Sequence, residues 1–339
     1  FHWFVEFYGI LKQGGFDVII GNPPYVEYSK VRKQYTIRFL DLVKTGNLYS
    51  ICFERFAALA VNSGRMGIIV PISSVSTPRM LPLMESLVLG FSALHVSNFA
   101  VRPGKLFVGA DMNLTILVGQ KTSGETTPTI YSTNYSRWYK EFRPYLFGTL
   151  TFTQSYLHRN TNSIPKVYCS VENAIMNKML NHAPLVRYRL ASRDSELVFC
   201  HSGGRYFRKC IRTQLSNEYK ELNIRKGLGD AAICLLSSSL YYWFWIIVSD
   251  CYHVTKGDID VFPVPDSVPK EDKFKNLSSR LLEDLWNNAR RRQRNRADGT
   301  VQEEVNFYVG KSKPIIDEID RVLAQHYGFT DEELDFIIN

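Results

Sequence analysis

The stretch FDVIIGNPPY at residues 16–25 limits what this chain can fold into more than any other part of it. Residues 16–20 are almost wholly apolar and rich in β-branched side chains, which predicts a strand buried on both faces, as in a parallel sheet. Gly21 ends this run. The Asn-Pro-Pro-Tyr that follows forms a stiff corner, because each proline fixes φ and lacks an N–H donor. We therefore expect a parallel sheet with a rigid loop at one strand end.

The residues after this corner predict the rest of such a sheet. Residues 47–63 carry apolar side chains at helical spacing behind Asn47, the expected N-cap. Further elements are expected as a strand at 66–71, a helix at 78–89 and strands at 91–99 and 113–119. The order β-α-β-α-β-β is that of the second half of a doubly wound α/β sheet. Ligands of such sheets bind in the loops after the strands, here 21–28 and 71–77.

The composition and periodicity of the sequence change after Lys121. A polar linker at 122–129 leads into short alternating stretches rich in Tyr, Arg, Ser and Asn, which indicate β-rich structure with long loops. Residues 231–248 carry no charge and are almost long enough to span a bilayer, but three consecutive serines favour a buried core helix over a transmembrane one. We expect no membrane partner.

The chain becomes helical again from Lys270. An arginine-rich helix is predicted at 277–297, and a further helix follows with Ile316, Ile319 and Leu323 on one face. Thr330 and Glu333 are spaced as a capping box for a last short helix.

Charge and cysteine usage narrow the possible partners. The 41 Lys and Arg residues exceed the 33 Asp and Glu residues, giving a net charge of +8 that favours a polyanionic partner. The six cysteines show no metal-ligand spacing, so we expect no metal site. Nothing resembles a secretory signal, and we expect a cytoplasmic protein. Because the first residues, from Phe1, are already apolar, we also expect an upstream segment of the same polypeptide.

The Asn-Pro-Pro-Tyr corner offers a specific chemistry. The Asn22 side-chain carbonyl and a backbone carbonyl of the prolines are two converging acceptors, which suit a planar NH₂ group with two donors. Accepting both hydrogens keeps the nitrogen lone pair from conjugating fully with its ring, so the nitrogen becomes a better nucleophile. Tyr25 offers a flat face on which a base can stack. An exocyclic amine on a base turned out of its helix is the expected ligand of the corner formed by Asn22, Pro23, Pro24 and Tyr25.

FDVIIGNPPY resembles motif IV, the catalytic motif of N6-adenine DNA methyltransferases. The surrounding residues, including NLYSICFERFAALAVNSGRMGIIVP and RPGKLFVGADMNLTILV, resemble Eco57I-like and type IIG restriction–modification enzymes of prokaryotes. This resemblance implies that Asn22 and the Pro23 carbonyl bind the target N6 amine, and that Tyr25 and Phe107 sandwich the flipped adenine. It further implies S-adenosyl-L-methionine as methyl donor and double-stranded DNA as substrate. Glu27 and Tyr28 are expected in a solvated loop.

The same resemblance divides the chain into three parts. It implies the catalytic half of a Rossmann-like methyltransferase sheet at 1–122, an α+β target recognition domain at 123–266 and a helical C-terminal segment at 267–339. Arginines expected to contact DNA are Arg137, Arg143, Arg159, Arg205, Arg208, Arg290, Arg291 and Arg292.

One departure from the family pattern bears on activity. The Gly-rich cofactor loop and the acidic ribose ligand of this class precede motif IV, and this chain has no such loop. We therefore expect the chain alone to bind S-adenosyl-L-methionine weakly and to be inactive. Two other functions stay open. One is a non-catalytic DNA-binding specificity module on a methyltransferase-like scaffold; the other is methylation of a different amine, cytosine N4 or a protein glutamine.

Overall fold

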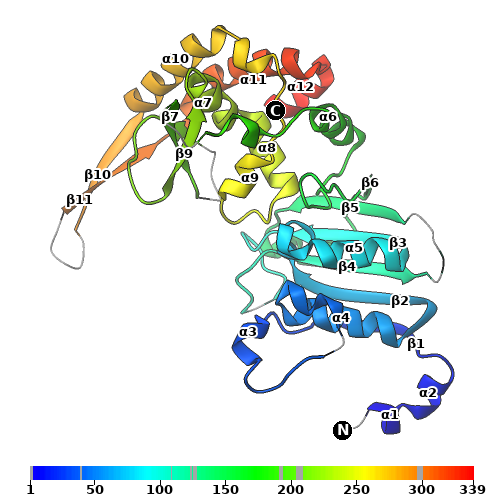
Figure 1. The fold of residues 1–339 in the computed structure, drawn as a ribbon. Helices are drawn as coiled ribbons and strands as arrows, with labels where there is room; N and C mark the ends of the chain where they lie inside the picture. The colour runs from blue at the N-terminus through cyan, green and yellow to red at the C-terminus, as the bar shows by residue number, and fades with distance from the viewer. Residues whose placement is uncertain are drawn as a thin grey trace. The chain divides into compact units, whose positions relative to one another are not determined.

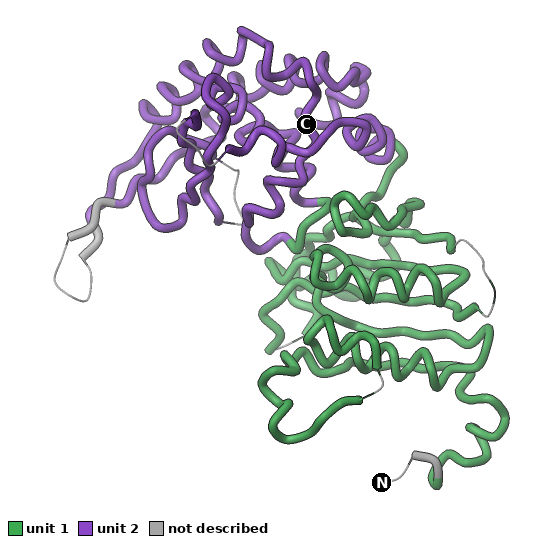
Figure 2. The backbone as a smooth tube through the Cα atoms, viewed as in Figure 1, with its two compact units in different colours: residues 1–170, 247–250 green, residues 171–246, 251–339 purple. Residues whose placement is uncertain are grey.

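The computed structural model describes residues 3–38, 40–107, 109–122, 124, 128–190, 194–203, 209–295 and 301–339. The chain divides into two compact units, which Figure 2 colours separately. The first comprises residues 1–170 and 247–250, and the second comprises 171–246 and 251–339. These units differ from the functional division at 122 and 266 expected from the sequence, which stays a prediction.

A six-stranded mixed sheet forms the first unit (Figure 1). Its strands are β1 (Phe16–Gly21), β2 (Ala60–Pro71), β3 (Phe91–Phe99), β4 (Leu114–Lys121), β5 (Thr129–Ser136) and β6 (Thr153–Ser155). Their order in space is β1-β2-β4-β3-β5-β6. Strands β1, β2, β3 and β5 run parallel to one another, and β4 and β6 run antiparallel to their neighbours. The carboxyl ends of the four parallel strands therefore meet at one edge of the sheet.

The helices of the first unit explain where its core lies. They are α1 (Trp3–Glu6), α2 (Tyr8–Lys12), α3 (Tyr28–Val31), α4 (Leu48–Leu59) and α5 (Leu81–Gly90), with 3-10 helices η1 (Asp41–Thr45), η2 (Ile72–Val75), η3 (Pro78–Met80) and η4 (Lys140–Tyr145). Figure 1 shows α4 and α5 over one face of the sheet. Phe53 of α4 and Leu83 of α5 share one buried cluster with Ile68, Val70 and Val96 of the strands. The β-α-β-α-β-β order predicted from the sequence is confirmed.

The prediction that residues 16–20 are buried on both faces is wrong. Ile19 packs against the core, but Val18 is 54% exposed and Ile20 is 82% exposed. Within the described residues, β1 pairs with β2 alone, and α4 and α5 lie on the face that Ile19 reaches. The apolar run thus produces a strand with one buried face and one open face.

Helices and a small antiparallel sheet make up the second unit. The helices are α6 (Ser170–Leu180), α7 (Gly229–Ser237), α8 (Ser239–Val248), α9 (Lys256–Asp260), α10 (Lys273–Asn287), α11 (Lys313–Tyr327) and α12 (Asp331–Ile338). The first residue of α6 and the last two residues of α8 belong to the first unit. The strands are β7 (Ser195–His201), β8 (Cys210–Ile211) and β9 (Tyr219–Arg225), in the order β8-β7-β9. The predicted capping box of Thr330 and Glu333 is confirmed at the start of α12.

The uncharged segment at 231–248 forms two helices rather than one. Ser238 lies between α7 and α8, and most of the apolar side chains of both helices are buried. Within the described part of the chain, no single helix is both long and apolar enough to cross a membrane. Helices α7 and α8 reach that length and composition only as a pair bent by 63°.

The predicted helix at 277–297 is wrong beyond Asn287. The arginine-rich residues form strand β10 (Ala289–Asn295), which pairs antiparallel with β11 (Val301–Phe307). Arginine has a good intrinsic helix propensity, so composition alone favours a longer helix. Pairing overrides this preference, because Arg292 lies opposite Glu304 in a partner strand that the arginine run itself does not reveal. The arginines therefore lie on a two-stranded ribbon.

Candidate active site

The Asn-Pro-Pro-Tyr corner lies at the carboxyl edge of the first sheet. Asn22 directly follows β1 and is exposed, Pro23 is buried and Pro24 is exposed. Because Asn22 follows a strand that is hydrogen-bonded to β2, its backbone is anchored on the strand side. Its carboxamide therefore projects from a fixed point into solvent.

Tyr25 orients that carboxamide. Its hydroxyl lies 2.8 Å from Asn22 Oδ1 and 3.0 Å from the carbonyl oxygen of Ile69, so its single proton is shared between two acceptors. The half-buried ring packs edge-on against Tyr49, with 6.4 Å between ring centroids. Burial raises the pKa of Tyr25 to about 12, so the hydroxyl stays protonated and able to donate at neutral pH. Tyr25 thus holds the Asn22 oxygen toward the sheet.

Two oxygen atoms at the corner can still accept hydrogen bonds from a ligand. Asn22 Oδ1 has a second lone pair beside the one that faces Tyr25. In the described part of the chain, no donor is bonded to the Pro23 carbonyl. An NH₂ group placed between these two oxygens would find an acceptor for each hydrogen.

Contacts on the far side of the corner hold the loop in place. The Glu27 carboxylate accepts two hydrogen bonds from the Arg79 guanidinium, at 3.0 and 2.6 Å. Two backbone hydrogen bonds join the loop to the segment before α4. Tyr28 N–H donates to Gly46 O at 2.8 Å, and Leu48 N–H donates to Val26 O at 3.0 Å. The expectation of a solvated loop at Glu27 therefore misses a structural role. No local signal could show it, because Arg79 is distant in sequence.

Phe107, the second stacking residue implied by the resemblance, lies on the same edge. It is half-buried in the loop between β3 and β4. Arg143 supports this loop, donating to the carbonyl of Leu106 at 3.0 Å and to that of Lys105. The Arg143 guanidinium also lies over the Trp138 ring, 5.0 Å from its centroid. Arg143 therefore has a positioning role that the sequence did not reveal.

The other predicted DNA-contacting arginines lie in different surroundings. Arg137 is exposed beside the Tyr135 ring, and Arg159 is paired with Glu85. Arg290 lies over the ring of Tyr308, Arg291 over that of Trp286, and Arg292 is exposed on β10. Arg205 and Arg208 lie outside the described residues.

Residues 1–84, which include the corner, match the family model described as Eco57I restriction-modification methylase. This match confirms the resemblance to Eco57I-like restriction–modification enzymes over these residues. A protein of Methanocaldococcus jannaschii, named as a type II restriction enzyme and methyltransferase, is 32% identical over 127 residues. This match covers 36% of this chain and 10% of the archaeal protein.

The solved structure of one restriction–modification enzyme shares the fold. The type IIL enzyme MmeI, solved in complex with DNA, aligns over 95% of this chain and 56% of its own, with a TM-score of 0.51. The identity is 12%, so this likeness concerns the fold alone. The α/β fold class predicted from the sequence, with its helical C-terminal segment, is confirmed. The chain spans about half of MmeI and a tenth of the archaeal relative.

Proposed function

We propose that this chain carries the target-adenine clamp of a site-specific DNA adenine-N6 methyltransferase of the restriction–modification kind. The observation that carries the proposal is the pair of open acceptors at Asn22 and Pro23, one of them oriented by Tyr25. The matched family and the archaeal relative are both described as methyltransferases, which supports the reaction class.

The chain's own residues would act by position. The N6 amine of an extruded adenine donates one hydrogen to Asn22 Oδ1 and the other to the Pro23 carbonyl. Both hydrogens then lie close to the plane of these acceptors, and the nitrogen lone pair is free to point out of the base plane. Fixing this geometry before reaction lowers the entropic part of the barrier. S-adenosyl-L-methionine, when bound, supplies the methyl group.

The loops nearest Asn22 do not fit a complete site for this cofactor. Loops 21–28, 71–77 and 100–113 contain two carboxylates that could accept from ribose hydroxyls. Glu27 is held by Arg79, and Asp111 is paired with Lys105.

We expect the 339-residue chain to bind S-adenosyl-L-methionine only weakly. Each carboxylate is already paired with a cation, so it is a weaker acceptor for ribose hydroxyls than a free carboxylate. Isothermal titration of the chain with the cofactor should give no saturation at micromolar concentration. A dissociation constant in the micromolar range would show that the described loops do form the site.

DNA as substrate is supported by charge and by shape. A two-stranded ribbon fits the major groove of B-DNA, and Arg290 and Arg292 share one exposed face of β10. The net charge of +8 favours a polyanion. MmeI, which shares the fold, was solved in complex with DNA.

Labelled S-adenosyl-L-methionine and mixed-sequence duplex DNA test the proposal directly. The natural polypeptide that contains residues 1–339 should place the label on adenine. Label on cytosine or on protein would contradict adenine specificity. DNA binding without any transfer would favour the non-catalytic specificity module, to which the incomplete cofactor fit also points.

Replacing Tyr25 by phenylalanine should lower the rate of methyl transfer about tenfold with little change in KM. The ring and its packing are retained, but the Asn22 carboxamide loses a hydrogen bond worth about 1–1.5 kcal/mol. Single-turnover transfer measures this effect. Since the pKa of Tyr25 is about 12, the wild-type rate should show no inflection from this hydroxyl between about pH 6 and 9. An unchanged rate in Tyr25→Phe would show that Asn22 is oriented by other groups.

A further inference from the structure

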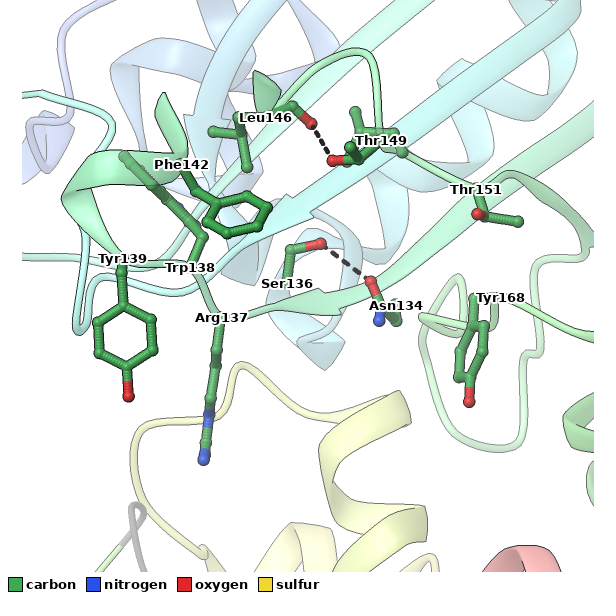
Figure 3. Close-up of a pocket in the computed structure, with 11 residues that line it drawn as sticks. Asn134, Ser136, Arg137, Trp138, Tyr139, Phe142, Leu146, Thr149, Thr151 and Tyr168 are labelled. Atoms are coloured by element: carbon green, nitrogen blue, oxygen red, sulfur yellow. Dashed lines mark hydrogen bonds between the residues drawn. The ribbon is translucent and has the colours of Figure 1, made fainter. Parts of the chain in front are cut away.

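A cavity of about 310 Å³ opens at the carboxyl end of β5, entirely within the first unit (Figure 3). Its lining includes the rings of Trp138, Tyr139, Phe142 and Tyr168. Its volume lies at the lower end of the range for small-molecule sites. The function proposed above makes no use of it.

Three of the four rings that line this cavity are well exposed, and the fourth, that of Trp138, is buried. Phe142 is 57% exposed, Tyr139 is 68% exposed and Tyr168 is 39% exposed, whereas Trp138 is only 5% exposed. In Figure 3, Trp138 and Phe142 lie on one side of the cavity and Tyr168 lies on the other. Exposed rings gathered in one place mark a binding surface more often than a solvated one.

Trp138 is held rigidly. Arg143 covers its ring, and Gly104 N–H donates to its carbonyl at 2.7 Å. A Cβ on Gly104 would come within 2.8 Å of the Trp138 ring, so only glycine permits this approach. A fixed aromatic floor loses little entropy when a flat ligand stacks near it.

The polar groups of the cavity indicate the charge of its ligand. The exposed Arg137 guanidinium has no carboxylate partner within the described residues, and Arg137 and Tyr139 extend in the same direction in Figure 3. Asn134 accepts a hydrogen bond from Ser136 at 2.9 Å, which leaves its NH₂ group to donate to a ligand. Flat rings, an amide donor and a guanidinium without a carboxylate partner among the described residues together suit a nucleotide, whose base stacks and whose phosphate is anionic. An apolar peptide would leave the arginine and the amide unused.

The position of the cavity relates it to DNA held at Asn22. Strands β1 and β5 are parallel, and β2, β4 and β3 lie between them. Four strand spacings of about 4.8 Å place the two sites roughly 19 Å apart along one edge of the sheet. A DNA strand covers this distance in about five to six nucleotides.

We propose that the cavity around Trp138 and Phe142 binds an unpaired nucleotide of the same DNA whose adenine enters the Asn22 clamp. This inference deepens the proposed function, because it takes the ligand to be DNA. Phe142 supplies an accessible stacking face, and Arg137 contacts the phosphate.

Binding to two labelled duplexes tests the proposal, one fully paired and one with a single unpaired thymidine. Fluorescence anisotropy with the 339-residue chain should show about tenfold tighter binding of the unpaired duplex. Phe142→Ala should remove this preference and Arg137→Ala should reduce it. Tyr8→Ala, which removes a ring 62% exposed on α2, and Arg55→Ala, which removes an exposed arginine of α4, should both retain it.

Two outcomes would overturn the inference: no preference in the wild type, or an unchanged preference in Phe142→Ala, which includes equal weakening of both duplexes. If no variant changes DNA binding, the exposed rings would instead suit a protein partner, and the nucleotide proposal would be wrong. Failure of the proposed methyltransferase function can be distinguished from failure of the nucleotide proposal. Asn22→Ala should keep the preference for the unpaired duplex, and a preference lost in Phe142→Ala would stand even if the methyl label were found off adenine.

Discussion

Replacing Asn22 by alanine is expected to lower the rate of methyl transfer by about 10²–10³-fold while leaving DNA affinity nearly unchanged. The substitution removes the acceptor that Tyr25 orients, and the target amine keeps only the Pro23 carbonyl. The amine is then free to rotate away from the reactive geometry. Since Asn22 is exposed, its truncation leaves no cavity in the core. Single-turnover transfer by the natural polypeptide measures the loss.

Asn62→Ala serves as the matched control for Asn22→Ala. Asn62 is an exposed asparagine near the amino end of β2, away from the carboxyl edge of the sheet. Its truncation should leave both transfer and DNA affinity unchanged. If Asn22→Ala transfers methyl groups at the wild-type rate, Asn22 has no part in the mechanism. If Asn22→Ala loses transfer and DNA affinity together, the residue binds DNA rather than acting on the amine.

Replacing Lys166 by methionine is expected to destabilise the first unit by about 1–3 kcal/mol. Lys166 is fully buried, and its ammonium donates to the carbonyl of Ile247 at 3.0 Å and to that of Ser249 at 2.6 Å. The Ile247 carbonyl keeps the backbone N–H of Lys166 at 3.0 Å, so the expected loss comes from the Ser249 carbonyl. The positive charge also faces the C-terminus of α8, where a cation stabilises the helix dipole.

Urea denaturation measures this effect as a lower midpoint for unfolding of the first unit. Lys44→Met is the control, because Lys44 is exposed in η1 and a surface substitution changes stability by about 0.5 kcal/mol at most. A similar small change for Lys166→Met would show that water or another donor satisfies the Ser249 carbonyl.

The sequence predicted the corner but not what holds it. A strand followed by the Asn-Pro-Pro-Tyr corner can be predicted from local residues, because proline and strand periodicity act over a few positions. The bond from Tyr25 to Ile69 could not be read, since it depends on the register in which β1 pairs with β2. The pairing of Glu27 with Arg79 depends in the same way on where η3 follows β2.

Two predictions failed because local composition did not determine the tertiary partner. The apolar run in β1 indicates burial on both faces, but Val18 and Ile20 are largely exposed among the described residues. Whether a second layer packs on a strand depends on tertiary structure, which a local pattern does not contain. The arginine run favours a helix, yet its pairing with β11 makes it a strand. The cavity around Trp138 was also missed, since its rings are brought together only when β5 joins the sheet.

The four residues 247–250 limit how the second unit can be exchanged. They pack with the first unit, where Lys166 binds Ile247 and Ser249, and Asn113 donates to the Asp250 carbonyl at 2.9 Å. The chain thus leaves the first unit after residue 170, returns at 247 and leaves again after 250. A single recombination junction at residue 170 would replace these four residues with foreign ones. Grafting a second unit from a relative therefore requires two insertions, 171–246 and 251–339, placed around a retained native tetrapeptide.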